Sequence, residues 1–219
     1  MLQNRVDPWG MLRTVPERGS LMGNRGILHN EERSIVKSWA HKHWVTCPLA
    51  FNDIKRPSPF STTNHYSELF FVDEATAFSA GHRPCAFCQR MRSNEFKAAW
   101  LEANVDTPER AGYSLSKIDA VLHKERAQWG GGKLVFEESL SQLPLGTMFE
   151  WNGDAHLVTT NGNLPWSFAG YRAPVELDRS SRVKVLTPAS IVKAFQVGFV
   201  PHSLSDETHA TGLRRGVTL

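Results

Sequence analysis

The sequence predicts an α+β protein: a cysteine-knuckle-containing N-terminal part with short strands and helices, followed by a small β-rich unit closed by a helix. Three observations support this fold class. A short capped helix leads into Cys85-x-x-Cys88, apolar residues recur at helical spacing from 96 to 122, and Asn-Gly pairs separate apolar segments after residue 133. We expect an α+β region over 1–129, a β-rich domain over 133–201 and a polar tail over 202–219, with the glycines at 130–132 as the hinge.

Residues 1–69 are rich in Gly, Pro, Asn and Arg and predict loops with a few strands. Residues 26–29 and 34–39 flank a polar turn at 30–33, as the strands of a hairpin do. A helix over the first of these segments is the competing prediction. Residues 44–46 predict another short strand, which leads into Cys47.

The helix before the cysteine pair is marked at both ends. Asp73 stands at the N-cap, Glu74 favours the positive end of the helix dipole, and Gly81 suits the left-handed position after the last turn. The next helix is predicted over 90–103, where apolar residues share one face. They are Phe96, Ala99, Trp100 and Ala103.

A third helix is predicted with Ser116 as its cap. Its inward stripe consists of Ile118, Val121 and Leu122. Its outer side carries Lys117, Lys124 and Arg126. These cations could contact phosphates, although an ordinary solvated face is the favoured interpretation.

The C-terminal unit begins with two strands, 147–151 and 154–160, joined by Asn152-Gly153. This pair is typical of a two-residue type I′ turn. Residues 164–171 and 182–186 predict further strands. Thr187 as cap and Pro188 at the first position predict a closing helix that ends at Gly198.

The cysteine pair predicts a metal site. Two thiolates three positions apart can bind one ion, because the turn between them brings both sulfurs to about 2.3 Å from a zinc. Cys47 is the third and last cysteine. Reduced thiols without metal are the alternative, and a redox-active pair is disfavoured because no thioredoxin-like strand-to-helix context precedes Cys85.

The residues around this pair carry a family resemblance. The pattern is Phe70-Phe71, Glu74-Ala75, Ala80-Gly81, Arg83-Pro84-Cys85 and Cys88. It resembles the zinc-binding module of the bacterial Ada family, which repairs alkylated DNA, over about residues 40–92.

The resemblance implies a closed, structural zinc site. Cys85 and Cys88 match the second cysteine pair of the family, and Cys47 matches one member of the first pair. His43 stands where the methyl-accepting cysteine would fall, with His65 or His41 as alternative fourth ligands. Since imidazole is not the nucleophilic thiolate that accepts the methyl group, methyl transfer is not expected here.

Other protein classes are disfavoured by the sequence. It contains no Walker loop, dinucleotide glycine pattern, nucleophile elbow or metalloprotease helix. A zinc deaminase is disfavoured because that class needs a His-x-Glu sequence on a helix ahead of its cysteine pair, whereas His65 is followed by Tyr66-Ser67-Glu68. No apolar stretch is long enough to cross a membrane, no signal peptide is apparent, and an odd cysteine count argues against a secreted disulfide scaffold. We therefore expect a cytoplasmic protein.

The distribution of charge suggests DNA as a partner. The net charge is +3 and the positive excess lies in residues 1–133. The basic residues considered as a phosphate-binding rim are those at 55–56, Lys42, Arg83, Arg90 and Arg92. A solvated surface without a partner is the alternative.

Two polar N-terminal segments, 4–10 and 23–26, could hold a base extruded from DNA. The residues considered for stacking, base reading and phosphate contact are Trp9, Asn4, Asn24, Arg5 and Arg25. Asp7 is the candidate catalytic carboxylate for cleavage of the base–sugar bond, with Glu68 as runner-up. The alternative is that the Asp7-Pro8 pair simply starts a turn.

The expected function is therefore DNA binding in DNA repair or modified-base processing, with a DNA glycosylase-type hydrolase as the first reaction to test. A non-enzymatic, zinc-dependent DNA-binding or regulatory module is one alternative. An RNA-processing or RNA-binding protein, in which the C-terminal unit carries recognition, is the other.

Overall fold

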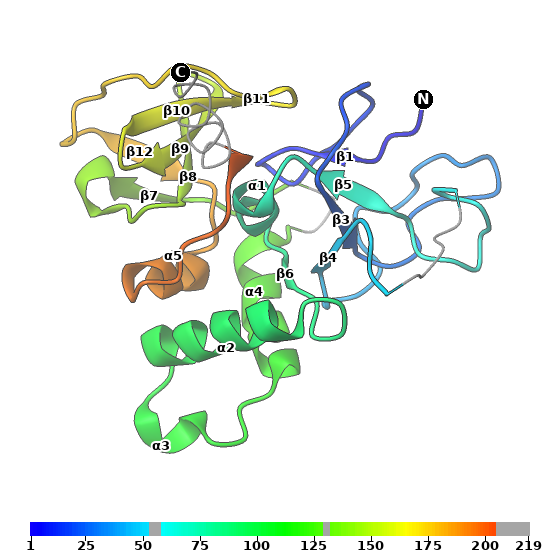
Figure 1. Ribbon diagram of the computed structural model, residues 1–219, viewed down its shortest axis with the longest axis horizontal. Helices are drawn as coiled ribbons and strands as arrows, with labels where there is room; N and C mark the ends of the chain where they lie inside the picture. The colour runs from blue at the N-terminus through cyan, green and yellow to red at the C-terminus, as the bar shows by residue number, and fades with distance from the viewer. Residues whose placement is uncertain (53–57, 129–131, 205–219) are drawn as a thin grey trace, which may run out of the picture.

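The computed structural model describes residues 1–52, 58–128 and 132–204. Within these residues the chain forms two six-stranded β-sheets, five α-helices and a short 3-10 helix, η1 (Leu140–Gln142), which confirms a mixed α+β fold (Figure 1). The basic pair at 55–56 and most of the predicted glycine hinge lie outside the described residues. Among the helices in the described ranges, none combines the length and apolar character that a membrane crossing requires.

The N-terminal sheet has the order β2-β1-β5-β3-β4-β6. Its strands are β1 (Arg5–Val6), β2 (Leu12–Arg13), β3 (Leu21–Asn24), β4 (Val45–Pro48), β5 (Leu69–Phe71) and β6 (Arg83–Pro84). The strand predicted over 44–46 is confirmed by β4. The hairpin predicted over 26–39 is reduced to one bridge, between His29 and Ile35, where the Asn30 amide donates to Ser34 across the turn.

Helix α1 (Glu74–Ser79) follows β5 and begins as predicted. Asp73 is its N-cap, and the Asp73 carboxylate accepts from the Thr76 amide at 2.8 Å. Gly81 follows the helix with a φ of 84°. A side chain at this position would also collide with Arg126, since an added Cβ would lie 2.4 Å from Arg126 Cδ.

Three helices form the middle of the chain: α2 (Arg90–Asn104), α3 (Thr107–Arg110) and α4 (Leu115–Arg126). The helix predicted over 90–103 is confirmed by α2. The cap predicted for α4 was wrong, because Ser114 accepts from the Lys117 amide, two residues before the expected Ser116.

The C-terminal sheet has the order β11-β10-β9-β8-β12-β7. Its strands are β7 (Phe136–Ser139), β8 (Met148–Trp151), β9 (Asp154–Thr159), β10 (Gly162–Ser167), β11 (Gly170–Tyr171) and β12 (Arg182–Val185). Asn152 and Gly153 have φ values of 52° and 85°, which confirms the turn with two positive φ angles. The closing helix is α5 (Ala189–Gln196), with Pro188 at its N-cap instead of its first position.

Side chains from both sheets and from the helices form shared hydrophobic clusters. One cluster joins α1, α2 and α4 to α5, and its members include Phe78, Phe96, Ile118, Ile191 and Phe195. A second joins residues 72 and 75 to β8, β9 and β10. Trp9 adds a polar link, because its Nε1 donates to Glu150 on β8 at 2.8 Å. The N-terminal loops are thereby held against the C-terminal sheet.

Candidate functional site

The three cysteines of the chain meet at one edge of the N-terminal sheet. Cys47 lies on β4, whereas Cys85 and Cys88 follow β6, which pairs with β4 in parallel. The Cys85 amide donates to the Thr46 carbonyl at 2.9 Å and holds the two segments together. The three Sγ atoms consequently lie within 4.8 Å of one another and could hold a metal ion.

Hydrogen bonds around this group favour a thiolate. The pKa of Cys85 is lowered to about 5, chiefly because Cys47 donates to its sulfur and also because the amides of Cys88 and Phe87 do so. The pKa of Cys47 is raised, because this thiol donates to Cys85 and is buried. A metal ion would replace the shared proton, and a group of thiolates suits a soft ion.

The histidines considered as a fourth ligand are placed elsewhere. Among the residues that the structure describes, His41, His43 and His65 do not join the sulfur group. His43 precedes β4, in a tight turn where the Trp44 amide donates to the Lys42 carbonyl, whereas Cys47 lies within the strand. The nearest charged partner of His65 is Glu68, whose Oε1 lies 3.6 Å from His65 Nε2.

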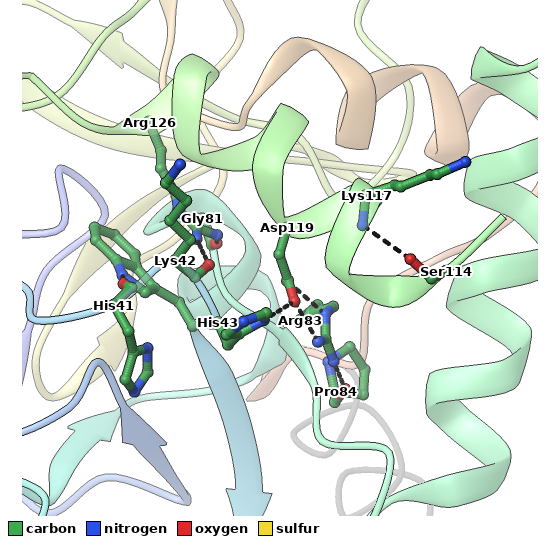
Figure 2. A network of polar contacts seen from close by, with 11 residues as sticks. His41, Lys42, His43, Gly81, Arg83, Pro84, Ser114, Lys117, Asp119 and Arg126 are labelled. Atoms are coloured by element: carbon green, nitrogen blue, oxygen red, sulfur yellow. Dashed lines mark hydrogen bonds and ion pairs between the residues drawn. The ribbon is translucent and has the colours of Figure 1, made fainter.

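His43 instead belongs to a polar network on α4 (Figure 2). Its Nδ1 donates to Asp119 Oδ2 at 2.6 Å, and Arg83 contacts both oxygens of the same carboxylate, at 2.7 and 2.6 Å. Asp119 is fully buried, while half of the His43 side chain is exposed. The carboxylate therefore fixes the orientation of the imidazole ring through its Nδ1.

The arginines predicted around the knuckle differ in how much charge they present. Arg83 is buried in its ion pair with Asp119, and Arg92 binds Glu74 at 2.7 Å and Glu95 at 3.0 Å. Arg90 is exposed, and no carboxylate of the described residues forms an ion pair with it. Of the three, Arg90 is the one free to meet a phosphate.

Lys42 is also exposed, and its carbonyl accepts a hydrogen bond from Arg126. Asn4 is buried, and its amide oxygen accepts from the half-buried Arg5 at 2.6 Å. Asn24 accepts from the Gly26 amide at 2.7 Å. These three contacts of Lys42, Asn4 and Asn24 stabilise the local backbone or a neighbouring side chain.

The two candidate catalytic carboxylates are both buried and hydrogen-bonded. Asp7 accepts from the Met11 amide at 2.9 Å and from Arg13 Nε at 2.8 Å, in the turn that the Asp-Pro pair starts. Glu68 accepts from the Phe60 amide at 3.0 Å. In this arrangement, both carboxylates hold loops in place.

Trp9 and Arg25, by contrast, meet in a pocket, which we call the tryptophan–arginine pocket. Its cavity of about 120 Å³ is lined chiefly by Trp9, Arg25, Trp39, Trp44, Arg126 and Lys133. Arg25 follows β3, Trp44 precedes β4 and Arg126 ends α4, so three elements converge on it. Three indole groups and three cations therefore surround one cavity.

No family model, curated protein or solved structure matches this chain. The resemblance to the Ada module stays a prediction.

Most of the pocket was missed from the sequence. Arg126 was expected on the outer face of its helix, and this was wrong: it is 2% exposed. No local signal points to this burial, which depends on the absence of a side chain at Gly81, where an added Cβ would lie 2.4 Å from Arg126 Cδ. Nothing in the local patterns around Trp39, Trp44 and Lys133 links them.

Proposed function

We propose that the protein is a cytoplasmic DNA-binding protein that handles damaged or modified bases, with a zinc ion held by Cys47, Cys85 and Cys88. The zinc would have a structural role, since it would join β4 to the turn after β6.

One observation carries the proposal: the cysteine turn ends in an exposed aromatic tip beside a free cation. Phe87 lies between the two cysteines and is 73% exposed, and Met91 in the first turn of α2 is 79% exposed. Arg90 is exposed next to them. Exposed apolar side chains on a rigid turn are suited to enter a base step, while a guanidinium contacts the backbone.

The first experiment measures binding of the zinc-loaded protein to duplexes with alkylated, deaminated or bulky bases, and to an unmodified duplex. We expect salt-sensitive binding that is tighter for at least one modified duplex. Phe87→Ala should remove this preference, and Arg90→Gln should reduce the slope of log affinity against log salt by about 1. Binding to all duplexes without dependence on Phe87 or Arg90 would contradict the proposal.

Hydrolysis of the base–sugar bond by Asp7 is the second candidate function. Burial lowers the pKa of Arg25 and Lys133, two residues of the pocket, and the charge of the Asp7 carboxylate opposes this lowering in both. A negative charge that acts on these pocket residues can also stabilise a sugar cation. Alkali treatment after incubation would reveal abasic sites, and Asp7→Asn should abolish them.

The same assay separates the remaining candidates. Tight binding without abasic sites, in the parent protein, would favour a non-enzymatic DNA-binding or regulatory module. Preferred binding of RNA in a competition between DNA and RNA of the same sequence would favour the RNA-binding alternative.

A further inference from the structure

The tryptophan–arginine pocket carries positive charge that the described protein does not neutralise. Arg25 and Arg126 lie on Trp44, each with its guanidinium carbon 4.2 Å from a ring centroid. Arg25 donates to the Gly10 carbonyl and to His82 Nε2, and Arg126 donates to the carbonyls of Gly81 and Lys42. All these acceptors are neutral.

Lys133 adds a third cation at the mouth of the pocket. Its Nζ donates to the carbonyls of Pro8 and Ser79, which are again neutral acceptors. Within the described ranges, no carboxylate forms an ion pair with Lys133, Arg25 or Arg126.

The nearby carboxylates are engaged elsewhere. Asp7 is paired with Arg13, and Asp119 is paired with Arg83. Glu125, next to Arg126 in the chain, accepts from the Ser190 hydroxyl at 2.6 Å. Burial is the main reason that the pKa values of Arg25 and Arg126 are lowered to about 9. Asp7 opposes the lowering at Arg25, and at Arg126 the attraction of Asp119 opposes it while the repulsion of Arg25 adds to it.

Two buried donors of this group find no acceptor among the residues that the structure describes. They are Arg25 Nη2 and Arg126 Nε, on side chains that are each 2% exposed. Arg25 Nη2 lies 3.5 Å from the position of a Cβ added to Gly10, and both residues line the cavity. A buried charged donor without a partner is costly, so these groups are suited to an anion that enters from outside.

The walls of the pocket add a second requirement. Trp9 and Trp39 are half-buried and line the cavity, which leaves part of their indole surface open to a ligand. A wider groove of about 550 Å³ borders the cavity and shares Trp9, Met11 and Lys133 with it. The cavity and the groove together thus form one site, with a narrow, cationic end and a wider end that has an aromatic side.

We propose that the tryptophan–arginine pocket binds a planar ring that carries a phosphate monoester. The phosphate accepts from Arg25, Arg126 and Lys133, since a dianion and guanidinium groups are complementary in charge and geometry. The ring lies against Trp9 or Trp39. The ligand is either a free nucleotide or the terminal nucleotide of a 5′-phosphorylated DNA strand, whose end phosphate is also a monoester, and only the second source rests on the function proposed above.

The test measures binding of thymidine 5′-monophosphate, the probe, to the full chain by calorimetry and by tryptophan fluorescence. We expect saturable binding that quenches emission, about tenfold weaker binding of inorganic phosphate, and no binding of thymidine at the same concentrations. Arg25→Gln and Arg126→Gln should each lower the affinity about tenfold or more. Arg182→Gln, an exposed arginine of the C-terminal sheet, is the matched control and should leave it unchanged.

Lys133→Gln and Trp39→Leu are second variants at the pocket mouth, in case the buried arginine variants fail to fold. Unchanged affinity in these folded variants, or no binding of the probe by the parent protein, would overturn the inference. Competition between the probe and DNA shows whether the two ligands occupy the same pocket. If saturating probe leaves DNA affinity unchanged, the free nucleotide is the ligand; if DNA does not bind but the probe does, the proposed function fails and the pocket assignment stands.

Discussion

The cysteine knuckle and the tryptophan–arginine pocket lie at opposite ends of β4, and they differ in how their buried polar groups are stabilised. At the knuckle, Cys47 shares a proton with a Cys85 thiolate that amides also stabilise. In the pocket, Arg25 and Arg126 are buried on the ring of Trp44, and their acceptors among the described residues are all neutral. Hydrogen bonds within the chain stabilise the knuckle thiolate, whereas the pocket cations have no negatively charged partner among the described residues.

The comparison teaches that the two sites should respond differently to substitution. Removal of a knuckle residue takes away a group on which folding depends. Removal of a pocket cation takes away a charge that the unliganded protein bears at a cost. The predictions below test this difference, starting with the largest effect.

The largest effect is expected for Cys85→Ser in the metal-loaded protein. Loss of one of three thiolates should release the ion and lower the free energy of unfolding by several kcal/mol, because the binding free energy of a structural zinc, about 10 kcal/mol or more, is folding free energy. Elemental analysis and thermal unfolding measure both. Ala86→Ser, within the same turn, is the control, and equal stability and metal content in the two variants would break the comparison.

Asp119→Asn should lower the free energy of unfolding by about 3–5 kcal/mol, because it leaves Arg83 as a buried charge without a counter-ion. Urea unfolding measures this change. Glu137→Gln removes the exposed partner of Arg182 and should cost less than about 1 kcal/mol. We expect Arg25→Gln to cost less than Asp119→Asn, since Arg25 has no carboxylate to lose; the reverse order would remove the distinction between paired and unpaired cations.

Lys133 should give the pocket a pH dependence. Burial lowers its pKa well below the ordinary 10.5, Arg25 and Arg126 lower it further, and Asp7 opposes them. Between the lowered and the ordinary pKa, the unfolded chain binds more protons than the folded one, so the free energy of unfolding should rise with pH. Lys133→Met should flatten this rise in unfolding curves at a series of pH values, whereas the exposed Lys193→Met should preserve it.

The smallest effect on folding is expected for Phe87→Ser. The side chain is 73% exposed, and its ring contacts Phe51 at a centroid distance of 5.6 Å, so the free energy of unfolding should change by about 0.5 kcal/mol or less. DNA affinity should nevertheless fall, as measured by fluorescence anisotropy. A large loss of stability would show that the tip belongs to the hydrophobic core.

The sequence predicted the elements whose signals are local. The Asp73 cap, the Asn152-Gly153 turn and α2 were found because propensity and spacing within a few residues determine them. The meeting of Cys47 with Cys85 was expected only through a family resemblance, and the structure brings them together by a parallel strand pair. His43 was assigned to the same site through that resemblance, but in the structure it binds Asp119 on α4.

The pocket could not be predicted because its residues come from positions 9, 25, 39, 44, 126 and 133. No periodicity connects segments that approach one another only after the sheets and helices have packed. Arg126 was assigned to a solvated face, since a basic residue in the last turn of a helix is usually exposed. Its burial depends on Gly81, more than forty positions earlier, and on the aromatic face of Trp44.

The parallel pairing of β4 and β6 has one more consequence. An ion bound by Cys47 and Cys85 would cross-link the chain and close a loop of about 40 residues. A cross-link of that span lowers the entropy of the unfolded chain and so stabilises the folded protein by about 4 kcal/mol. Chelation should therefore expose the enclosed segment to proteolytic cleavage before the C-terminal sheet is attacked. Limited digestion with and without a chelator would display the order of cleavage directly.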